Sequence, residues 1–159
     1  MIRSFMLGLL CASFVSATTA PAFRGELING DRISLSDKLD QKKMVLLSFW
    51  ASWCVPCMEE LRQVGVHMAA ENLNLEVLTV NVDTGETSSG VKATVREQKL
   101  TFPVVLDPKH EIFTKYSPTE SLPFSVLIAP DGTVVKTFNG YRDDMFTKIK
   151  EQMALQVKS

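Results

Sequence analysis

Two hydrophobic periods follow each other in the first half of this chain. Residues Met44–Trp50 are apolar except at Ser48, and an apolar run of this length is typical of a strand covered on both faces. After a short interval, apolar residues recur three or four positions apart, as on the inward face of a helix, at Met58, Leu61, Val64 and Met68. The pattern therefore predicts a central strand, a tight turn and a helix that extends to about residue 70.

The rest of the pattern predicts a series of shorter elements. A hairpin over residues 23–35 turns at Asn29-Gly30, a dipeptide that favours tight turns. Beyond residue 70 the expected elements are a strand over 75–83, a helix over 89–100, a strand over 102–107, a short helix over 111–116, a hairpin of 124–129 with 133–138, and a last helix capped by Asp143-Asp144. We expect His110, in the loop before the short helix, to face solvent.

Residues 1–22 have the plan of a secretory signal. Arg3 supplies the charged start, and residues 5–15 form an apolar run. Small residues follow, and they allow cleavage after Ala17 or after Ala22. We therefore expect a signal peptide and a protein that is secreted across the inner membrane into the periplasm.

An uncleaved membrane anchor is the alternative for this leader. Residues 4–23 carry no charge, as an anchor requires. Their dense apolar part is only about half of the ~20 residues that cross a bilayer, which favours cleavage. The expected domain is then 23–159, in contact with a membrane only if the leader is retained.

Composition narrows the function. The chain has 159 residues, 45% hydrophobic and 22% charged, as in an ordinary globular domain. A net charge of −1 argues against nucleic-acid binding, which needs concentrated basic charge. Of three cysteines, Cys11 lies in the leader and Cys54 and Cys57 remain after cleavage. A secreted protein with a single Cys-x-x-Cys pair is not a disulfide-stapled scaffold, so the pair is expected to be catalytic.

Cys54 and Cys57 lie where the predicted strand gives way to the helix. Unpaired backbone N–H groups and the helix dipole favour a thiolate there, and Cys-x-x-Cys motifs at helix starts lower a thiol pKa from about 8.5 to roughly 3.5–7.5. We interpret Cys54 as the nucleophile and Cys57, one turn deeper, as the resolving thiol. Pro56 suits the first turn, and Trp53 is expected to shield one side of the sulfur.

Two segments of the chain resemble a known family. The stretch FWASWCVPC, ending at Cys57, looks like the active-site segment of thioredoxin-fold proteins. Its continuation to Glu60 resembles the TlpA/ResA-type extracytoplasmic thiol–disulfide oxidoreductases of the redoxin group, and residues 121–132 resemble their cis-proline segment. The resemblance implies an α/β, thioredoxin-like fold, with a central mixed sheet flanked by helices, an N-terminal β-hairpin and a helix–strand insertion.

The resemblance also changes the expectation for Leu122-Pro123. From local sequence alone the trans form is favoured, because X–Pro bonds in folded proteins are cis in only about 5–6% of cases. The family places a cis-proline opposite the dithiol, which implies a cis bond before Pro123. Leu122 would then present its backbone N–H and C=O to an extended substrate chain. The expected substrate contacts are Trp53, Pro56, Leu122 and Pro123.

Glu60 has two interpretations. Cytoplasmic thioredoxins carry a buried Asp at the position of Ser48, so here another group must handle the proton of Cys57. Glu60 lies one helical turn beyond Cys57, and a desolvated carboxylate there could relay protons. The alternative is a glutamate that merely favours the helix dipole. The family pattern Cys-x-x-Glu favours the relay.

The resemblance implies an enzyme that exchanges thiols and disulfides. Cys54 attacks a substrate disulfide and Cys57 resolves the mixed disulfide, so no dissociable cofactor is needed. Its partners would be proteins with thiols or disulfides and a membrane electron donor. Related proteins outside the cytoplasm commonly reduce apocytochrome c or copper-site cysteines, which favours a reductase. A thiol oxidase or isomerase would use the same residues.

Two other classes fit less well. In a metal-binding module, for example for copper delivery, the cysteine pair would be part of the metal site. A structural zinc site needs four ligands, however, and the sequence has no second Cys or His pair to complete one. A peroxidase would need a peroxidatic cysteine in a different sequence context, and the Cys-x-x-Cys pair argues against it. We therefore expect no metal in the site.

Overall fold

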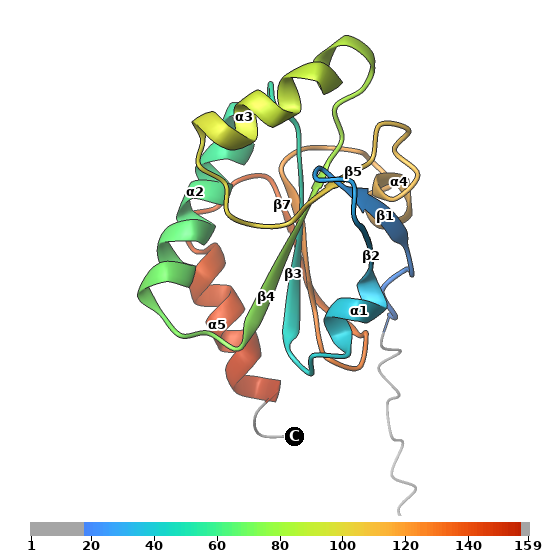
Figure 1. Ribbon diagram of the computed structural model, residues 1–159. Coiled ribbons are helices and arrows are strands. Elements are labelled where there is room, and N and C mark those ends of the chain that lie inside the picture. Colours follow the sequence, from blue (N-terminus) through green and yellow to red (C-terminus); the bar gives the residue numbers. More distant parts are fainter. Residues whose placement is uncertain (1–17, 157–159) are drawn as a thin grey trace, which may run out of the picture.

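The computed structural model describes residues 18–156, built on a seven-stranded mixed sheet in the order β2-β1-β5-β4-β3-β6-β7 (Figure 1). At its centre, β3 (Met44–Trp50) pairs in parallel with β4 (Leu75–Asn81), which pairs in parallel with β5 (Val104–Leu106). Every residue of β3 is buried. The predicted central strand is therefore confirmed, covered on both faces.

Antiparallel strands complete both sides of the sheet. On one side, β3 pairs with β6 (Phe124–Ile128), and β6 pairs with β7 (Val134–Asn139). On the other side, β1 (Arg24–Leu27) joins the short strand β5, and β2 (Arg32–Ser34) forms the outer edge. The predicted N-terminal hairpin is thus an extension of the main sheet.

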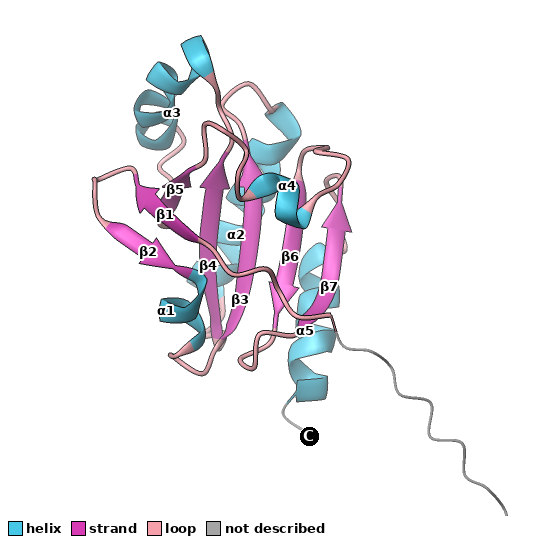
Figure 2. Ribbon diagram, turned by 90° about the vertical axis from the view of Figure 1, so that its right-hand side faces the viewer, coloured by secondary structure: helices cyan, strands magenta, loops and turns pink. Residues whose placement is uncertain are grey.

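Helices cover both faces of the sheet. Figure 2 shows α2 (Val55–Ala70) and α5 (Met145–Gln156) behind it, with α1 (Leu35–Leu39) and α4 (Phe113–Tyr116) on the opposite face. Side chains of β3 alternate between two buried clusters, with Val45, Leu47 and Phe49 in one and Met44 and Leu46 in the other. This alternation explains the continuous apolar run, and the α/β thioredoxin-like fold is confirmed.

Aromatic rings surround the end of β3. The Phe49 ring stacks on Phe113 of α4 with 5.0 Å between ring centroids, and it also contacts Tyr116 and Phe124 at 5.5 and 6.1 Å. The same cluster contains the two cysteines of the motif. The turn that follows β3 is therefore seated on a closely packed part of the core.

Three expectations about the connections are corrected. The segment predicted as a helix over 89–100 is a 3₁₀ helix, Gly85–Gly90, followed by α3 (Val91–Glu97), and it ends early because Lys99 has a φ of 52°. The short helix begins at Phe113, not at residue 111. His110 does not simply face solvent: it is partly buried, and both ring nitrogens have partners.

Residues 18–22, which the sequence analysis assigns to the leader, pack against the domain. The Ala20 N–H donates to the Gly132 carbonyl at 2.8 Å, and the Val134 N–H donates to the Thr18 carbonyl at 2.8 Å. The Tyr116 hydroxyl donates to the carbonyl of Pro21. Residues 1–17 of the predicted leader, with the cleavage site at Ala17 and the alternative of a membrane anchor, lie outside the described residues. None of the helices within 18–156 is long and apolar enough to cross a membrane.

Candidate active site

The cysteine pair lies at the junction between β3 and α2. Cys54 is the N-cap of α2, with an extended backbone, and Pro56 falls in the first turn. Cys54 and Cys57 form a disulfide, with 2.02 Å between sulfurs and 5.3 Å between Cα atoms. The Cys57 N–H donates to Cys54 Sγ at 3.3 Å. When the pair is reduced, a backbone donor and the positive end of a 16-residue helix both favour charge on Cys54.

The two sulfurs differ in access to solvent. Cys54 is 5% exposed and Cys57 is 1% exposed. The apolar residues on either side of Cys54 lie at the surface, with Trp53 64% and Val55 79% exposed. Cys54 is therefore the more accessible sulfur, within an apolar rim of the kind that partner proteins cover.

The turn before the cysteines is held by a buried carboxylate, Asp83, that the sequence analysis did not single out. Asp83 accepts hydrogen bonds from the Ser52 N–H and Ser52 Oγ, both at 2.7 Å, and from Asn81 Nδ2 at 2.7 Å. Burial opposes the charge, but these hydrogen bonds outweigh it and hold the pKa of Asp83 below its usual value. An ionised side chain from the end of β4 thus fixes the active-site turn.

Glu60 is buried behind the cysteine pair, only 2% exposed. Its Oε1 accepts from Ser48 Oγ at 3.1 Å and from Ser125 Oγ at 2.6 Å, while Oε2 has no partner among the described residues. Desolvation raises the pKa of Glu60, although the two serine hydroxyls oppose this. Glu60 also lines a pocket of about 170 Å³ with Gln63, His67 and Tyr141. A carboxyl whose pKa is raised by burial keeps its proton to a higher pH than an exposed glutamate does, and it can exchange that proton with a neighbouring thiol.

Ser125 is a site residue that the sequence analysis missed. It lies directly opposite Ser48 in the pairing of β6 with β3, so both hydroxyls point at the same carboxylate oxygen. Ser125 and Glu60 are 65 positions apart in sequence. The only sign of this role in the sequence is a serine between apolar neighbours in a strand, and that pattern does not indicate which residue the serine bonds to.

The loop before β6 lies beside the cysteine turn. The peptide bond between Leu122 and Pro123 is cis. Because Phe124 pairs with Phe49 in antiparallel register, Pro123 lies next to the end of β3, from which the cysteine turn departs. Leu122 packs against the cluster that contains both cysteines. Within residues 18–156, its backbone N–H and C=O make no hydrogen bond, so both are open to an added chain.

The described part of the chain was searched for side chains that could bind a metal ion. No group of three or more His, Cys, Asp and Glu side chains there is arranged to hold a metal ion. The two histidines are engaged elsewhere: His67 stacks on Phe146 and contacts Glu71, and His110 contacts Glu120. The chemistry that the site does offer is reversible exchange between a dithiol and a disulfide.

Comparison with known proteins agrees with this chemistry. The sequence profile of the AhpC/TSA family matches residues 17–137. Thiol-disulfide oxidoreductase ResA of Bacillus subtilis (strain 168) is 36% identical over 129 residues, 80% of this chain and 69% of that protein. Sporulation thiol-disulfide oxidoreductase A of the same organism is 36% identical over 117 residues, 72% of this chain and 68% of that protein. The solved structure of StoA from Bacillus subtilis, 32% identical, matches with a TM-score of 0.65 and covers 77% of this chain and 90% of its own.

Fold, cysteine pair and relatives together define a thioredoxin-like thiol–disulfide oxidoreductase. The chain belongs to the AhpC/TSA family. Within that family it is similar to the ResA and StoA proteins, as the two sequence segments implied.

Proposed function

We propose that this protein reduces disulfide bonds in other proteins outside the cytoplasm. The observation that carries the proposal is the Cys54–Cys57 pair at the start of α2, with the more accessible sulfur at the N-cap. In the reduced enzyme, the Cys54 thiolate attacks one sulfur of the substrate disulfide and the other leaves as a thiolate. Cys57 then attacks Cys54, which releases the second substrate sulfur. Two electrons pass to the substrate, and the enzyme is left as the Cys54–Cys57 disulfide.

Glu60 is assigned the proton transfer in this cycle. Cys57 must lose its proton before it attacks, and Glu60 lies one helical turn away on the same helix. Burial favours the protonated carboxyl, so Glu60 can accept the proton of Cys57 and return it when the dithiol forms again. The pocket shared by Glu60, Gln63 and Tyr141 offers that proton an exit to solvent.

The substrate is assigned to the surface around Cys54. Trp53 of the apolar rim and the exposed Pro56 lie on one side of Cys54, and Leu122 and Pro123 form the neighbouring loop. An extended peptide could pair with the free N–H and C=O of Leu122 while its disulfide lies against Cys54. Backbone pairing is insensitive to sequence, so specificity would come from the side chains that contact the rim.

The location and partners are proposed as follows. Cleavage after Ala17 is favoured over cleavage after Ala22, because the latter would remove residues 18–22 and their contacts with Gly132, Val134 and Tyr116. The expected substrates are apocytochrome c or copper-site cysteines, and a membrane electron donor would return the enzyme to its dithiol form. Intact mass of the protein recovered from the periplasm tests the cleavage site: a chain that starts at residue 23 contradicts it.

Trapping of mixed disulfides tests the proposed reaction and substrate class together. Cys57→Ser should retain attack by Cys54 but lose resolution, so it should accumulate a covalent adduct with oxidised apocytochrome c. Cys54→Ser is the matched control and should form none. Adduct formation by Cys54→Ser, or its absence with Cys57→Ser on every disulfide protein offered, would contradict the assigned roles. An adduct with a copper-site protein but not with apocytochrome c would assign the substrate.

A further inference from the structure

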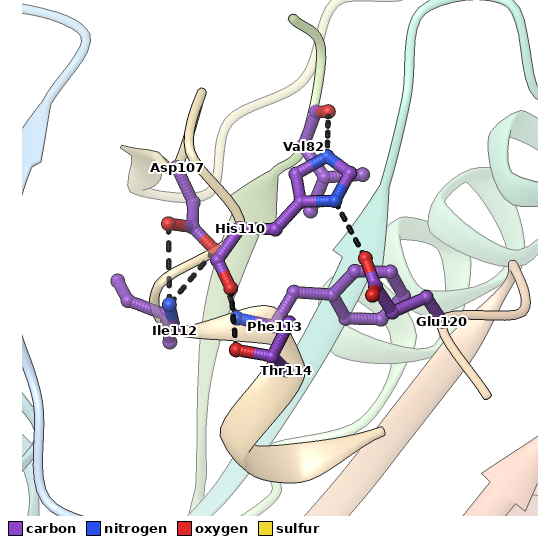
Figure 3. A network of polar contacts seen from close by, with 7 residues as sticks. All are labelled: Val82, Asp107, His110, Ile112, Phe113, Thr114 and Glu120. Atoms are coloured by element: carbon purple, nitrogen blue, oxygen red, sulfur yellow. Dashed lines mark hydrogen bonds and ion pairs between the residues drawn. The ribbon is translucent and has the colours of Figure 1, made fainter. Parts of the chain in front are cut away.

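A second polar network connects the Leu122-Pro123 loop with the strand end that holds the cysteine turn (Figure 3). His110 lies in the loop between β5 and α4, and its ring has a partner at each nitrogen. Nε2 is 2.9 Å from the Val82 carbonyl oxygen, and Nδ1 is 2.7 Å from the Glu120 carboxylate. A carbonyl and an ionised carboxylate both only accept hydrogen bonds. Both contacts are therefore satisfied together only when both ring nitrogens carry a proton.

Each end of this bridge leads to one side of the proposed substrate site. On one side, the Val82 N–H donates to the Trp50 carbonyl at 2.9 Å, and the adjacent Asp83 holds Ser52. On the other side, Glu120 lies two residues before Leu122. His110 is thus the link between the segment that leads into the cysteines and the loop beside them.

The backbone at both ends of the ion pair is in an unfavourable conformation. His110 has a φ of 56° and Glu120 a φ of 45°, in the left-handed region that residues with a side chain rarely adopt. Such conformations persist where surrounding contacts enforce them, and they concentrate at functional sites. Here the His110 ring is also held against the edge of the Phe113 ring, and its carbonyl accepts from Thr114.

We infer that His110, as the imidazolium, is a positioning residue that fixes the loop before Pro123 relative to the cysteine turn. The inference rests on the proposed function, in which that loop receives the substrate chain. Loss of the ring proton removes one of the two hydrogen bonds and the ion pair, so the loop is freed on one side. Substrate affinity should then fall while the chemistry at Cys54 continues.

The charges around the ring favour the protonated form. Glu120 faces it from the loop and Asp107 from the segment before α4, and both are acidic. Burial opposes the charge, but the Val82 carbonyl and these two carboxylates outweigh it and raise the pKa of His110 above its ordinary value. A raised pKa means that the stabilisation is complete below about pH 6.5, the unfolded value, and is lost as pH rises through the folded value. The loop is therefore held while the His110 ring is protonated, and it is released as the pH rises through the raised pKa of His110.

Nuclear magnetic resonance of the full chain tests the link without reference to activity. Between pH 5 and 9, the amide signals of residues 119–122 should shift with the same midpoint as the ring protons of His110. Glu120→Gln should move that midpoint to lower pH, because it removes the carboxylate charge, and should leave the signals of His67 in place. The inference would be overturned if the amide signals of residues 119–122 did not shift as His110 titrates, or if the midpoint were unchanged in Glu120→Gln.

Insulin reduction, with dithiothreitol as the electron source, tests the effect on substrate binding. His110→Gln and Glu120→Gln should raise KM at pH 6 on the order of threefold, the effect of one lost charge-assisted hydrogen bond at a partly exposed site, with kcat nearly unchanged. The wild-type KM should approach theirs as pH rises toward 9. The second His–Glu pair supplies the control: Glu71→Gln removes the carboxylate that contacts His67 and should follow the wild type.

The outcomes separate the inference from the function on which it rests. If both variants keep the wild-type KM at every pH, His110 does not position the substrate loop. If the wild type reduces no protein disulfide, the proposed function fails, and the amide titration still decides whether His110 holds the loop. Should His110→Gln fold poorly, Glu120→Gln retains the imidazole and tests the same ion pair.

Discussion

The buried charge of Glu60 should control how easily Cys57 becomes a thiolate. Residues three apart on a helix have their Cβ atoms about 5–6 Å apart, which places the Glu60 carboxylate near Cys57. Two like charges at about 6 Å repel by about 3 kcal/mol at an effective dielectric constant of about 20. Glu60→Gln keeps the shape and can still accept from the serine hydroxyls, but it removes this repulsion. The thiolate fraction of Cys57 should then rise on the order of a hundredfold at a given alkaline pH.

The assay follows Cys57 as the only thiol. In a Cys11→Ser, Cys54→Ser background, the pH dependence of iodoacetamide alkylation reports the thiolate of Cys57. Glu59→Gln is the matched control, because Glu59 is on the same helix but exposed and paired with Arg62. The alkylation profile of Glu59→Gln should overlay that of the background protein, in which Glu60 is intact. At acid pH, where Glu60 is itself protonated, the Glu60→Gln effect should vanish. Equal profiles for Glu60→Gln and Glu59→Gln across alkaline pH would refute the electrostatic coupling.

Three further predictions concern stability. The pKa of Glu60 in the folded protein lies above its unfolded value of about 4.3, so the free energy of unfolding of the wild type should fall as pH rises between the two values. Glu60→Gln should lack that fall, and the same pH dependence of urea unfolding in both proteins would contradict this. Asp83→Asn can no longer accept every hydrogen bond from Ser52 and Asn81, so its free energy of unfolding in urea should be lower by about 1–3 kcal/mol. An unchanged urea midpoint would mean that the turn does not depend on these hydrogen bonds. Phe113→Ala removes a buried ring stacked on Phe49 and should cost about 3–5 kcal/mol in the same assay; a loss below 1 kcal/mol would show that the cluster refills the space.

The elements that carry the cysteines follow from local sequence. An apolar run, a Cys-x-x-Cys and a helical apolar stripe specify β3, the turn and α2, because each depends on residues within a few positions of one another. The strands of the closing hairpin and the last helix are predictable for the same reason. Resemblance to a family supplied the sheet arrangement and the cis bond before Pro123, which local preference opposes.

The polar networks could not be predicted, because their partners are remote in sequence. Ser125 reaches Glu60 across 65 positions, Asp83 reaches Ser52 across 31, and His110 reaches Val82 across 28. No periodicity links such residues, since their meeting depends on strand order and register. A lone serine or histidine in a loop or strand looks the same in sequence whether it is exposed or bonded on every side.

The reduction potential of the Cys54–Cys57 pair tests the central claim most directly. The protein would be equilibrated in glutathione and dithiothreitol buffers, and its oxidised fraction would be measured by mass after thiol alkylation. A potential near about −270 mV or lower, as in thioredoxin, is the result that a reductase fed by an electron donor requires. A potential near about −120 mV, as in strong oxidants, would mean that the pair installs disulfides, and the reductase function would be wrong.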